Sequence, residues 1–203
     1  MCGIAGAFCS ENASERSIIE MVNRVQHRGP DDLGVWNDYK NKIFLAHRRL
    51  AIIDLSNNGH QPMSSNSDRY VIVFNGEIYN HNNLRKEFFE GYKWQSSSDT
   101  ETILASFDKW GIEKSLQYFR GMFAIAVWDK FEQTLTLIRD RFGEKPLFFY
   151  KGKEGIIFSS ELKAIKYLLK ENPSINQEAL SMFLSLSYVP APLSIYKNIY
   201  KLE

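Results

Sequence analysis

The second residue of this 203-residue chain is a cysteine whose position can give it two reactive groups. Aminopeptidases that remove an initiator methionine accept a small second side chain, so we expect Met1 to be removed. Cys2 would then carry a thiol, with an ordinary pKa of about 8.5, and a free α-amine, with an ordinary pKa of about 7.7–8.0. Because the amine can accept the thiol proton, nucleophile and general base would share one residue. Position alone leaves a second interpretation open, an incidental cysteine at a frayed chain end.

Other polar residues stand where a binding site can use them, although each also has a structural explanation. Arg49, in an otherwise apolar stretch, can bind an anion or form half of a surface ion pair. Asp99 occupies a position where a helix N-terminus favours a carboxylate. The dipeptide Asn75-Gly76 is typical of a simple turn. The histidines are scattered without the spacing of metal ligands, so we expect no metal site.

Composition limits the classes of function. A net charge of +1 argues against a nucleic-acid or anionic-membrane surface, which would need an excess of basic residues. The two cysteines form neither a disulfide framework nor a zinc-type spacing, which favours a reducing compartment. No apolar run reaches the length of about 18 residues that suggests a membrane span, and the first residues lack the charge of a signal peptide. We therefore expect a cytoplasmic protein.

The apolar pattern predicts short strands joined by polar turns, with helices between them. A helix over residues 14–26 begins at a candidate N-cap, Ser14. The run Ser98-Asp99-Thr100-Glu101 matches a capping box and predicts a second helix that stops at Gly111. Further helices are expected near residues 84–88, 161–169 and 177–184. The predicted strands cover residues 3–9, 34–36, 43–46, 70–74, 122–128, 134–138, 147–150 and 156–158.

Several of these strands are apolar along their whole length, which predicts that both faces of their sheets are covered. Most strands follow one another as hairpins, so the sheets should be antiparallel. Antiparallel sheets covered by helices and by each other indicate a layered α+β fold. The composition, 44% hydrophobic, supports a sizeable core for a single domain. We expect this domain to span residues 1–189. Residues 190–203 show no periodicity and are expected to be a connector.

Five motifs occur in an order that identifies a family resemblance. They are Cys2-Gly3-Ile4, Arg28-Gly29-Pro30-Asp31, Arg49-Leu50-Ala51-Ile52-Ile53-Asp54, Phe74-Asn75-Gly76-Glu77-Ile78-Tyr79-Asn80 and Ser97-Ser98-Asp99-Thr100-Glu101. Together they closely resemble the glutaminase domain of glutamine-hydrolysing asparagine synthetases, which are class II glutamine amidotransferases. The resemblance extends from Cys2 to about Tyr188 and includes the segment 139–147.

This resemblance implies a four-layer αββα sandwich of two antiparallel sheets, the N-terminal-nucleophile (Ntn) hydrolase fold. It also implies a reaction in which the Cys2 sulfur attacks the side-chain amide of glutamine and forms a γ-glutamyl thioester. The Cys2 α-amine would take the thiol proton and later help to protonate ammonia. The side-chain amide of Asn75 and the backbone N–H of Gly76 would stabilise the oxyanion.

The resemblance assigns the rest of the glutamine site as well. The planar guanidinium of Arg49 would bind the α-carboxylate of glutamine, a task that a lysine performs less well. Asp99, with Glu77 contributing, would bind the α-ammonium, and the backbone around Ile53 would line the site. No metal or organic cofactor is expected for this half-reaction.

In the longer relatives that the resemblance implies, a second domain uses ATP and Mg²⁺ and receives the ammonia, making asparagine from aspartate. This chain contains no Ser-Gly-Gly-x-Asp-Ser-type pyrophosphate loop. We therefore expect it to hydrolyse glutamine and to depend on a C-terminal synthetase domain for the second step; a homodimer is left open.

Two alternatives stand beside this interpretation. A related amidotransferase could amidate another carboxylate, such as a sugar acid of a surface polysaccharide. A non-catalytic module kept for packing or regulation is the second alternative. The presence of Cys2, Arg49, Asn75, Gly76 and Asp99 together argues against a decayed site.

Overall fold

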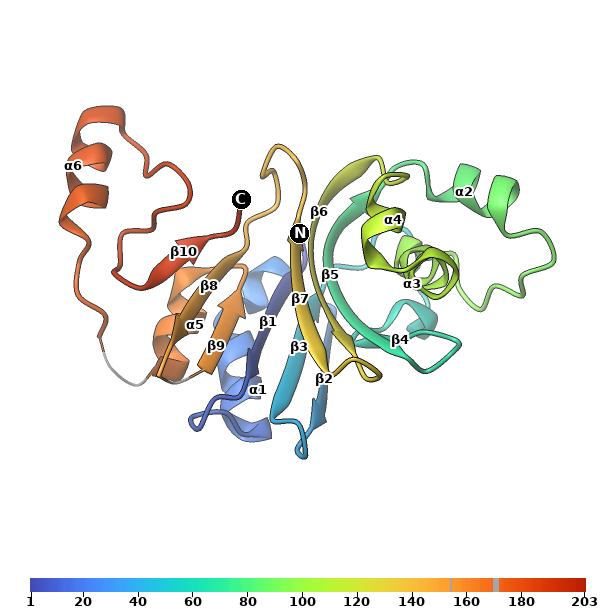
Figure 1. The fold of residues 1–203 in the computed structure, drawn as a ribbon, viewed down its shortest axis with the longest axis horizontal. Helices are drawn as coiled ribbons and strands as arrows, with labels where there is room; N and C mark the ends of the chain where they lie inside the picture. Colours follow the sequence, from blue (N-terminus) through green and yellow to red (C-terminus); the bar gives the residue numbers. More distant parts are fainter. Residues whose placement is uncertain (154, 170–171) are drawn as a thin grey trace.

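The computed structural model describes residues 1–153, 155–169 and 172–203, which form two antiparallel sheets packed face to face, with helices on both outer sides (Figure 1). The first sheet has the strand order β10-β8-β9-β1-β3-β2 and the second the order β4-β5-β6-β7. The strands of the first sheet are β1 (Gly3–Phe8), β2 (Asp32–Asp38), β3 (Ile43–Arg49), β8 (Phe148–Gly152), β9 (Gly155–Ser159) and β10 (Ile199–Lys201). Those of the second are β4 (Met63–Ser64), β5 (Tyr70–Ile78), β6 (Gly121–Asp129) and β7 (Thr134–Arg139).

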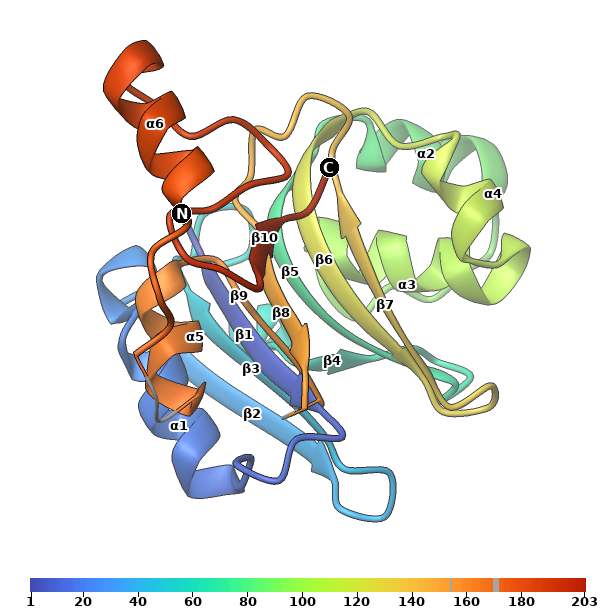
Figure 2. The same cartoon turned by 60° about the vertical axis from the view of Figure 1, so that its left-hand side comes forward.

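Helices α1 (Glu15–Asn23) and α5 (Leu162–Leu169) cover the first sheet, whereas α2 (His81–Phe88), α3 (Asp99–Trp110) and α4 (Ile112–Leu116) cover the second (Figure 1). The last helix, α6 (Gln177–Leu186), stands away from both sheets (Figure 2). In the described ranges, no helix combines the length and the apolar content that crossing a membrane requires. The predicted α+β class and the αββα layering are confirmed.

Three separate cores hold the four layers together, and each sheet contributes alternate residues to two of them. On β5, Ile72 and Phe74 pack toward α3, whereas Val71 and Val73 pack toward the first sheet. On β1, Ala5 packs toward the helices, with Ala7, whereas Ile4 packs toward the second sheet. This two-residue alternation decides which polar side chains enter the space between the sheets.

The same alternation places the predicted site residues. Cys2 has the parity of Ile4, and Arg49 has the parity of Ile43 and Leu45, which all face the second sheet. Asn75 continues the row of Val71 and Val73, which face the first sheet. Side chains from both sheets therefore meet in the layer between them.

Helix ends follow the sequence signals closely, with two differences. Ser14 and Ser17 form a reciprocal capping box at the start of α1, but this helix ends at Asn23 and a 3-10 turn follows over Gln26–Arg28. Ser98 caps α3 by accepting a hydrogen bond from Thr100 N, and Gly111, at φ 77°, ends that helix as predicted. The predicted role of Glu101 in a capping box is wrong, because its carboxylate accepts from the backbone of Gln95 and Ser96 instead.

Two stretches of strand differ from the expected pattern. The strand predicted over residues 70–74 continues to Ile78, so Asn75 and Gly76 lie inside β5 and pair with β6 instead of forming a turn. The segment 190–203 contains β10, which pairs with β8 at the edge of the first sheet (Figure 2). The sequence pattern gave no sign of this three-residue strand. The domain boundary at residue 190 stays a prediction.

Candidate active site

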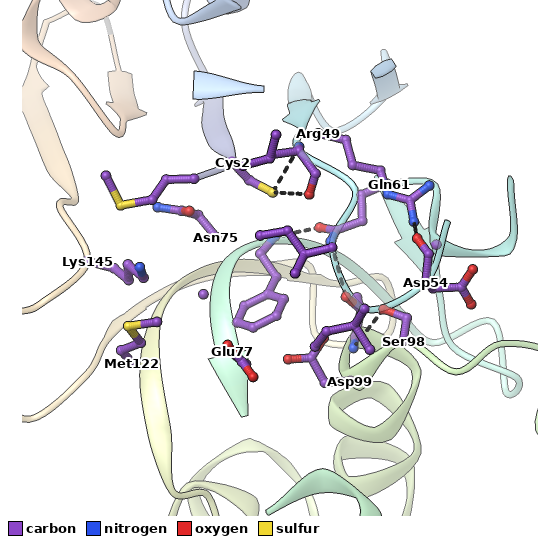
Figure 3. A pocket seen from close by; sticks show the side chains of 18 residues that line it. Cys2, Arg49, Asp54, Gln61, Asn75, Glu77, Ser98, Asp99, Met122 and Lys145 are labelled. Carbon is purple, nitrogen blue, oxygen red and sulfur yellow. Dashed lines mark hydrogen bonds between the residues drawn. The ribbon is translucent and has the colours of Figure 1, made fainter. Parts of the chain in front are cut away.

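A cavity of about 170 Å³ is lined by residues of both sheets and of α3. By the same measure one water molecule needs only about 10–15 Å³, so the cavity admits a small metabolite. It is lined by every residue that the sequence assigns to the site: Cys2, Arg49, Ile53, Asn75, Gly76, Glu77 and Asp99. Figure 3 shows Cys2 and Asn75 toward the top of the cavity and Glu77 and Asp99 toward its bottom.

The Cys2 thiol is held at one end of this cavity by the chain just after β3. Leu50 N donates to Cys2 Sγ at 3.4 Å, and Sγ donates to Leu50 O at 3.7 Å. The Cys2 carbonyl accepts from Arg28 Nε at 2.9 Å, which fixes the backbone beside the thiol. Burial raises the pKa of the Cys2 thiol, and the hydrogen bond from Leu50 only partly opposes this effect. The thiol is therefore protonated at neutral pH and needs a base before it can attack.

Asn75 presents a buried and unsatisfied hydrogen-bond donor to the same cavity. The residue is 1% exposed, and its Nδ2 has no hydrogen-bond partner among the described residues. A buried donor without a partner typically costs about 1–3 kcal/mol, so such groups call for an explanation. A ligand oxygen in the cavity would satisfy this donor.

Gly76 supplies a second donor through its backbone. In an antiparallel pair, alternate residues direct their N–H groups toward or away from the partner strand. The N–H groups of Phe74 and Ile78 both donate to side chains on the edge of β5 that faces away from β6. Gly76 lies midway between these two residues, so its N–H also points away from β6. A Cβ at Gly76 would lie 2.1 Å from Met122 O, so only glycine permits this backbone path.

Arg49 ends β3 and organises the loop that follows it. Its Nη1 donates to Ser56 O at 2.8 Å, and its Nη2 donates to Asp54 O. Gly59 packs against the guanidinium, since a Cβ there would meet Arg49 Nη2 at 2.1 Å. Of the five N–H groups of an arginine, two are used in these bonds, which leaves others for an anion in the cavity.

The loop over residues 50–60 is tied to the start of α3 through Asp54. The Asp54 carboxylate accepts from Ser56 Oγ at 2.6 Å and from Ser97 N at 2.9 Å. These hydrogen bonds, led by that from Ser56, lower the pKa of Asp54 to about 2. Ile53 lies on this loop at the cavity and is 38% exposed. The loop therefore forms one wall of the cavity. It includes the backbone around Ile53, which the family resemblance predicts to line the site.

Asp99 and Glu77 place carboxyl groups at the other end of the cavity. Asp99 is the first residue of α3 and is 4% exposed, and its Oδ2 accepts from Ile78 N at 2.8 Å. Burial raises the pKa of Asp99 to about 6, the nearby Glu77 adds to the rise, and the hydrogen bond from Ile78 opposes it. A buried carboxylate of this kind gains most when a ligand brings a positive charge.

The cavity also contains residues that the sequence reasoning missed. Gln61, Met122 and Lys145 line it, and Lys145 is 7% exposed. Lys145 belongs to the segment 139–147 that was part of the family resemblance, so a signal was present for it. No sequence signal was present for Gln61 and Met122, because no motif around either residue indicates that it lies near Cys2.

One histidine lies deep between the two sheets. His47 is buried between the sheets and Phe74 O lies 3.1 Å from its Nε2, while burial lowers its pKa to about 4. Among the residues that the structure describes, no group of three or more His, Cys, Asp or Glu side chains is arranged to hold a metal ion.

Comparison with known proteins places the whole chain in one family. Residues 1–203 match the family model described as "Glutamine amidotransferase domain". The chain is 38% identical to the "Putative asparagine synthetase [glutamine-hydrolyzing] 2" of Methanocaldococcus jannaschii, with 100% of this chain and 42% of that protein covered. It is 36% identical to "Asparagine synthetase [glutamine-hydrolyzing] 1" of Bacillus subtilis, with 100% of this chain and 32% of that protein covered.

The chain thus spans less than half the length of these relatives. Among solved structures, it is similar to the glutamine phosphoribosylpyrophosphate amidotransferase of Bacillus subtilis, with a TM-score of 0.68 at 20% identity. That match covers 82% of this chain and 43% of the other. At this identity the likeness establishes the shared fold.

Proposed function

The chain belongs to the glutamine amidotransferase domain family, and from this premise we propose that it hydrolyses glutamine to glutamate and ammonia at the Cys2 cavity. The observation that carries the proposal is the pairing of a half-buried thiol with the unsatisfied Asn75 Nδ2 donor in one cavity. A nucleophile attacking a carbonyl carbon needs such a donor where the oxygen becomes negative.

The cavity holds partners for both charged groups of free glutamine, which are attached to the same carbon atom. Arg49 offers a planar guanidinium to the α-carboxylate, and Asp99 with Glu77 offers negative charge to the α-ammonium. The same cavity is lined by these residues and by Cys2, so both charged groups and the amide of one small molecule can be bound at once.

The proposed reaction starts with transfer of the Cys2 thiol proton to the Cys2 α-amine, which becomes free when Met1 is removed. The raised pKa of the thiol makes such a base necessary. Sulfur attacks the amide carbon, and Asn75 Nδ2 and Gly76 N–H donate to the oxyanion. When the oxyanion collapses, the carbon–nitrogen bond breaks, the amine returns its proton to the leaving nitrogen, and ammonia departs. Water then attacks the γ-glutamyl thioester, which releases glutamate and restores the thiol.

Every protein group that this scheme uses lies on Cys2, Asn75 or Gly76, and the proposal needs no metal or organic cofactor for glutamine hydrolysis. The names of the longer relatives support a further proposal, that the ammonia serves asparagine synthesis from aspartate in a C-terminal synthetase domain that uses ATP and Mg²⁺. No observation on this chain favours a sugar acid as the acceptor. A cytoplasmic location fits a reaction that depends on a reduced thiol.

The test is glutamate release by the purified chain and by two cysteine variants. Cys2→Ala should abolish glutamate release, because Cys2 and not Cys9 lines the cavity. The same variant should leave the fold intact. Cys9→Ala is the matched control, since Cys9 is exposed beyond the end of β1 and should be dispensable. Glutamate release by Cys2→Ala at the wild-type rate would show that the mechanism is wrong.

A further inference from the structure

Gln61 is a buried polar residue at the cavity whose side chain joins the second sheet to α3. It is 5% exposed and lies just before β4. Its Oε1 accepts from Phe74 N at 2.7 Å, and its Nε2 donates to Thr100 Oγ1 at 3.1 Å. Because a backbone N–H can only donate, the Gln61 oxygen must face β5 and its nitrogen must face α3.

Gln61 takes the place of a neighbouring strand along one edge of β5. On that edge β4 pairs only with Val71 and Ile72, so the next outward-facing peptide groups are those of Phe74. Phe74 N binds Gln61, and Phe74 O lies 3.1 Å from His47 Nε2. A carbonyl can only accept, so His47 must carry its proton on Nε2. Side chains therefore hold both outward groups of Phe74.

After Phe74, the next two N–H groups that point outward from β5 are those of Gly76 and Ile78. The Ile78 N–H donates to Asp99 Oδ2 at 2.8 Å. Phe74 and Ile78 are thus each tied to the first turn of α3, one through Gln61 and Thr100, the other through Asp99. Between these two links lies the segment 75–77, which contains both proposed oxyanion donors. The Gly76 N–H between them is left to face the cavity.

We infer that Gln61 is a positioning residue, which sets the place of the Asn75 and Gly76 donors relative to Cys2 and Asp99. This role rests on the proposed glutamine hydrolysis. Oxyanion donors act at about 2.7–3.1 Å from the developing charge, and a misplacement of about 1 Å can lower a rate about 100-fold. Without Gln61, the hydrogen bonds described here would tie α3 to this stretch of β5 at the Ile78 end alone.

The variant that tests this role is Gln61→Met, which keeps the length of the side chain and removes both hydrogen bonds. It should lower kcat for glutamine hydrolysis about 10- to 100-fold and change KM less than about threefold, because the donors act mainly in the transition state. Gln117→Met is the matched control, since Gln117 is exposed at the end of α4 and should keep wild-type kinetics.

Hydrogen exchange gives a readout that does not depend on turnover. The amides of Asn75 and Glu77 pair with β6 and do not touch Gln61, so they report the order of the donor segment. They should exchange faster in Gln61→Met than in Gln117→Met or the wild type.

A kcat within about twofold of the wild-type value would overturn the inference, and so would exchange at Asn75 and Glu77 that matches the control. A fall in kcat that only follows the unfolded fraction, measured by thermal unfolding, would also overturn it. A wild-type chain that releases no glutamate would contradict the proposed function instead. Exchange at residues 75 and 77 would then still decide whether Gln61 orders this segment.

Discussion

Asp99 gives the sharpest quantitative prediction, because its burial has opposite consequences for stability and for binding. The side chain is 4% exposed, and burial raises its pKa from 3.8 to about 6. One pKa unit corresponds to about 1.36 kcal/mol, so the folded protein favours the protonated carboxyl by roughly 3 kcal/mol. An ionised Asp99 therefore lowers the free energy of unfolding at neutral pH.

Proton linkage sets the direction in which the free energy of unfolding changes with pH. Between pH 3.8 and about pH 6, the folded state holds a proton on Asp99 that the unfolded state has lost. Stability from this group is thus complete at low pH and declines as the pH rises through about 6. Asp99→Asn cannot ionise and still offers an oxygen to Ile78 N–H. Its free energy of unfolding relative to wild type should therefore increase from pH 4 to pH 7 by up to about 3 kcal/mol.

Denaturant unfolding of both proteins at several pH values measures this difference in the free energy of unfolding. Steady-state kinetics with glutamine measure the effect of Asp99 on binding. Asp99→Asn should raise KM for glutamine, and the wild-type KM should rise as the pH falls below about 6, because a protonated Asp99 no longer attracts an ammonium group. Asp108→Asn, on the exposed end of α3, is the matched control and should leave KM unchanged. A stability difference that stays constant from pH 4 to pH 8 would refute the reasoning.

Two substitutions test the remaining walls of the cavity. Gly76→Ala should lower kcat by at least about 100-fold, because its Cβ would lie 2.1 Å from Met122 O and force the donor backbone to move; steady-state kinetics within tenfold of wild type would contradict this. Arg49→Lys should raise KM for glutamine at least about tenfold, because lysine lacks the planar fork and cannot keep the bonds to the Asp54 and Ser56 carbonyls while binding a carboxylate. An unchanged KM would show that Arg49 only supports the loop.

Much of the site could be predicted because its residues lie in local motifs with local causes. Ser14 and Ser98 are helix caps in the structure as in the sequence. The apolar run that begins β5 identified a strand, and the side-chain alternation along it explains why Asn75 faces Cys2 across the sheets.

The rest could not be predicted because its causes are distant in the chain. Asn75-Gly76 has the composition of a turn, but pairing with β6 along nine residues overrides that preference. Gln61 is joined to Phe74 and Thr100 across 13 and 39 residues, so no local pattern could identify its role. Glu101 had the spacing of a capping box, yet the turn at Gln95 and Ser96 uses its carboxylate.

The most direct test of the central claim is the mass of the intact protein before and after treatment with the glutamine analogue 6-diazo-5-oxo-norleucine. The account predicts loss of Met1 and a single adduct that maps to Cys2 and is prevented by glutamine. A chain that has lost Met1 and still forms no adduct, or forms one on Cys9 that glutamine does not block, would contradict it.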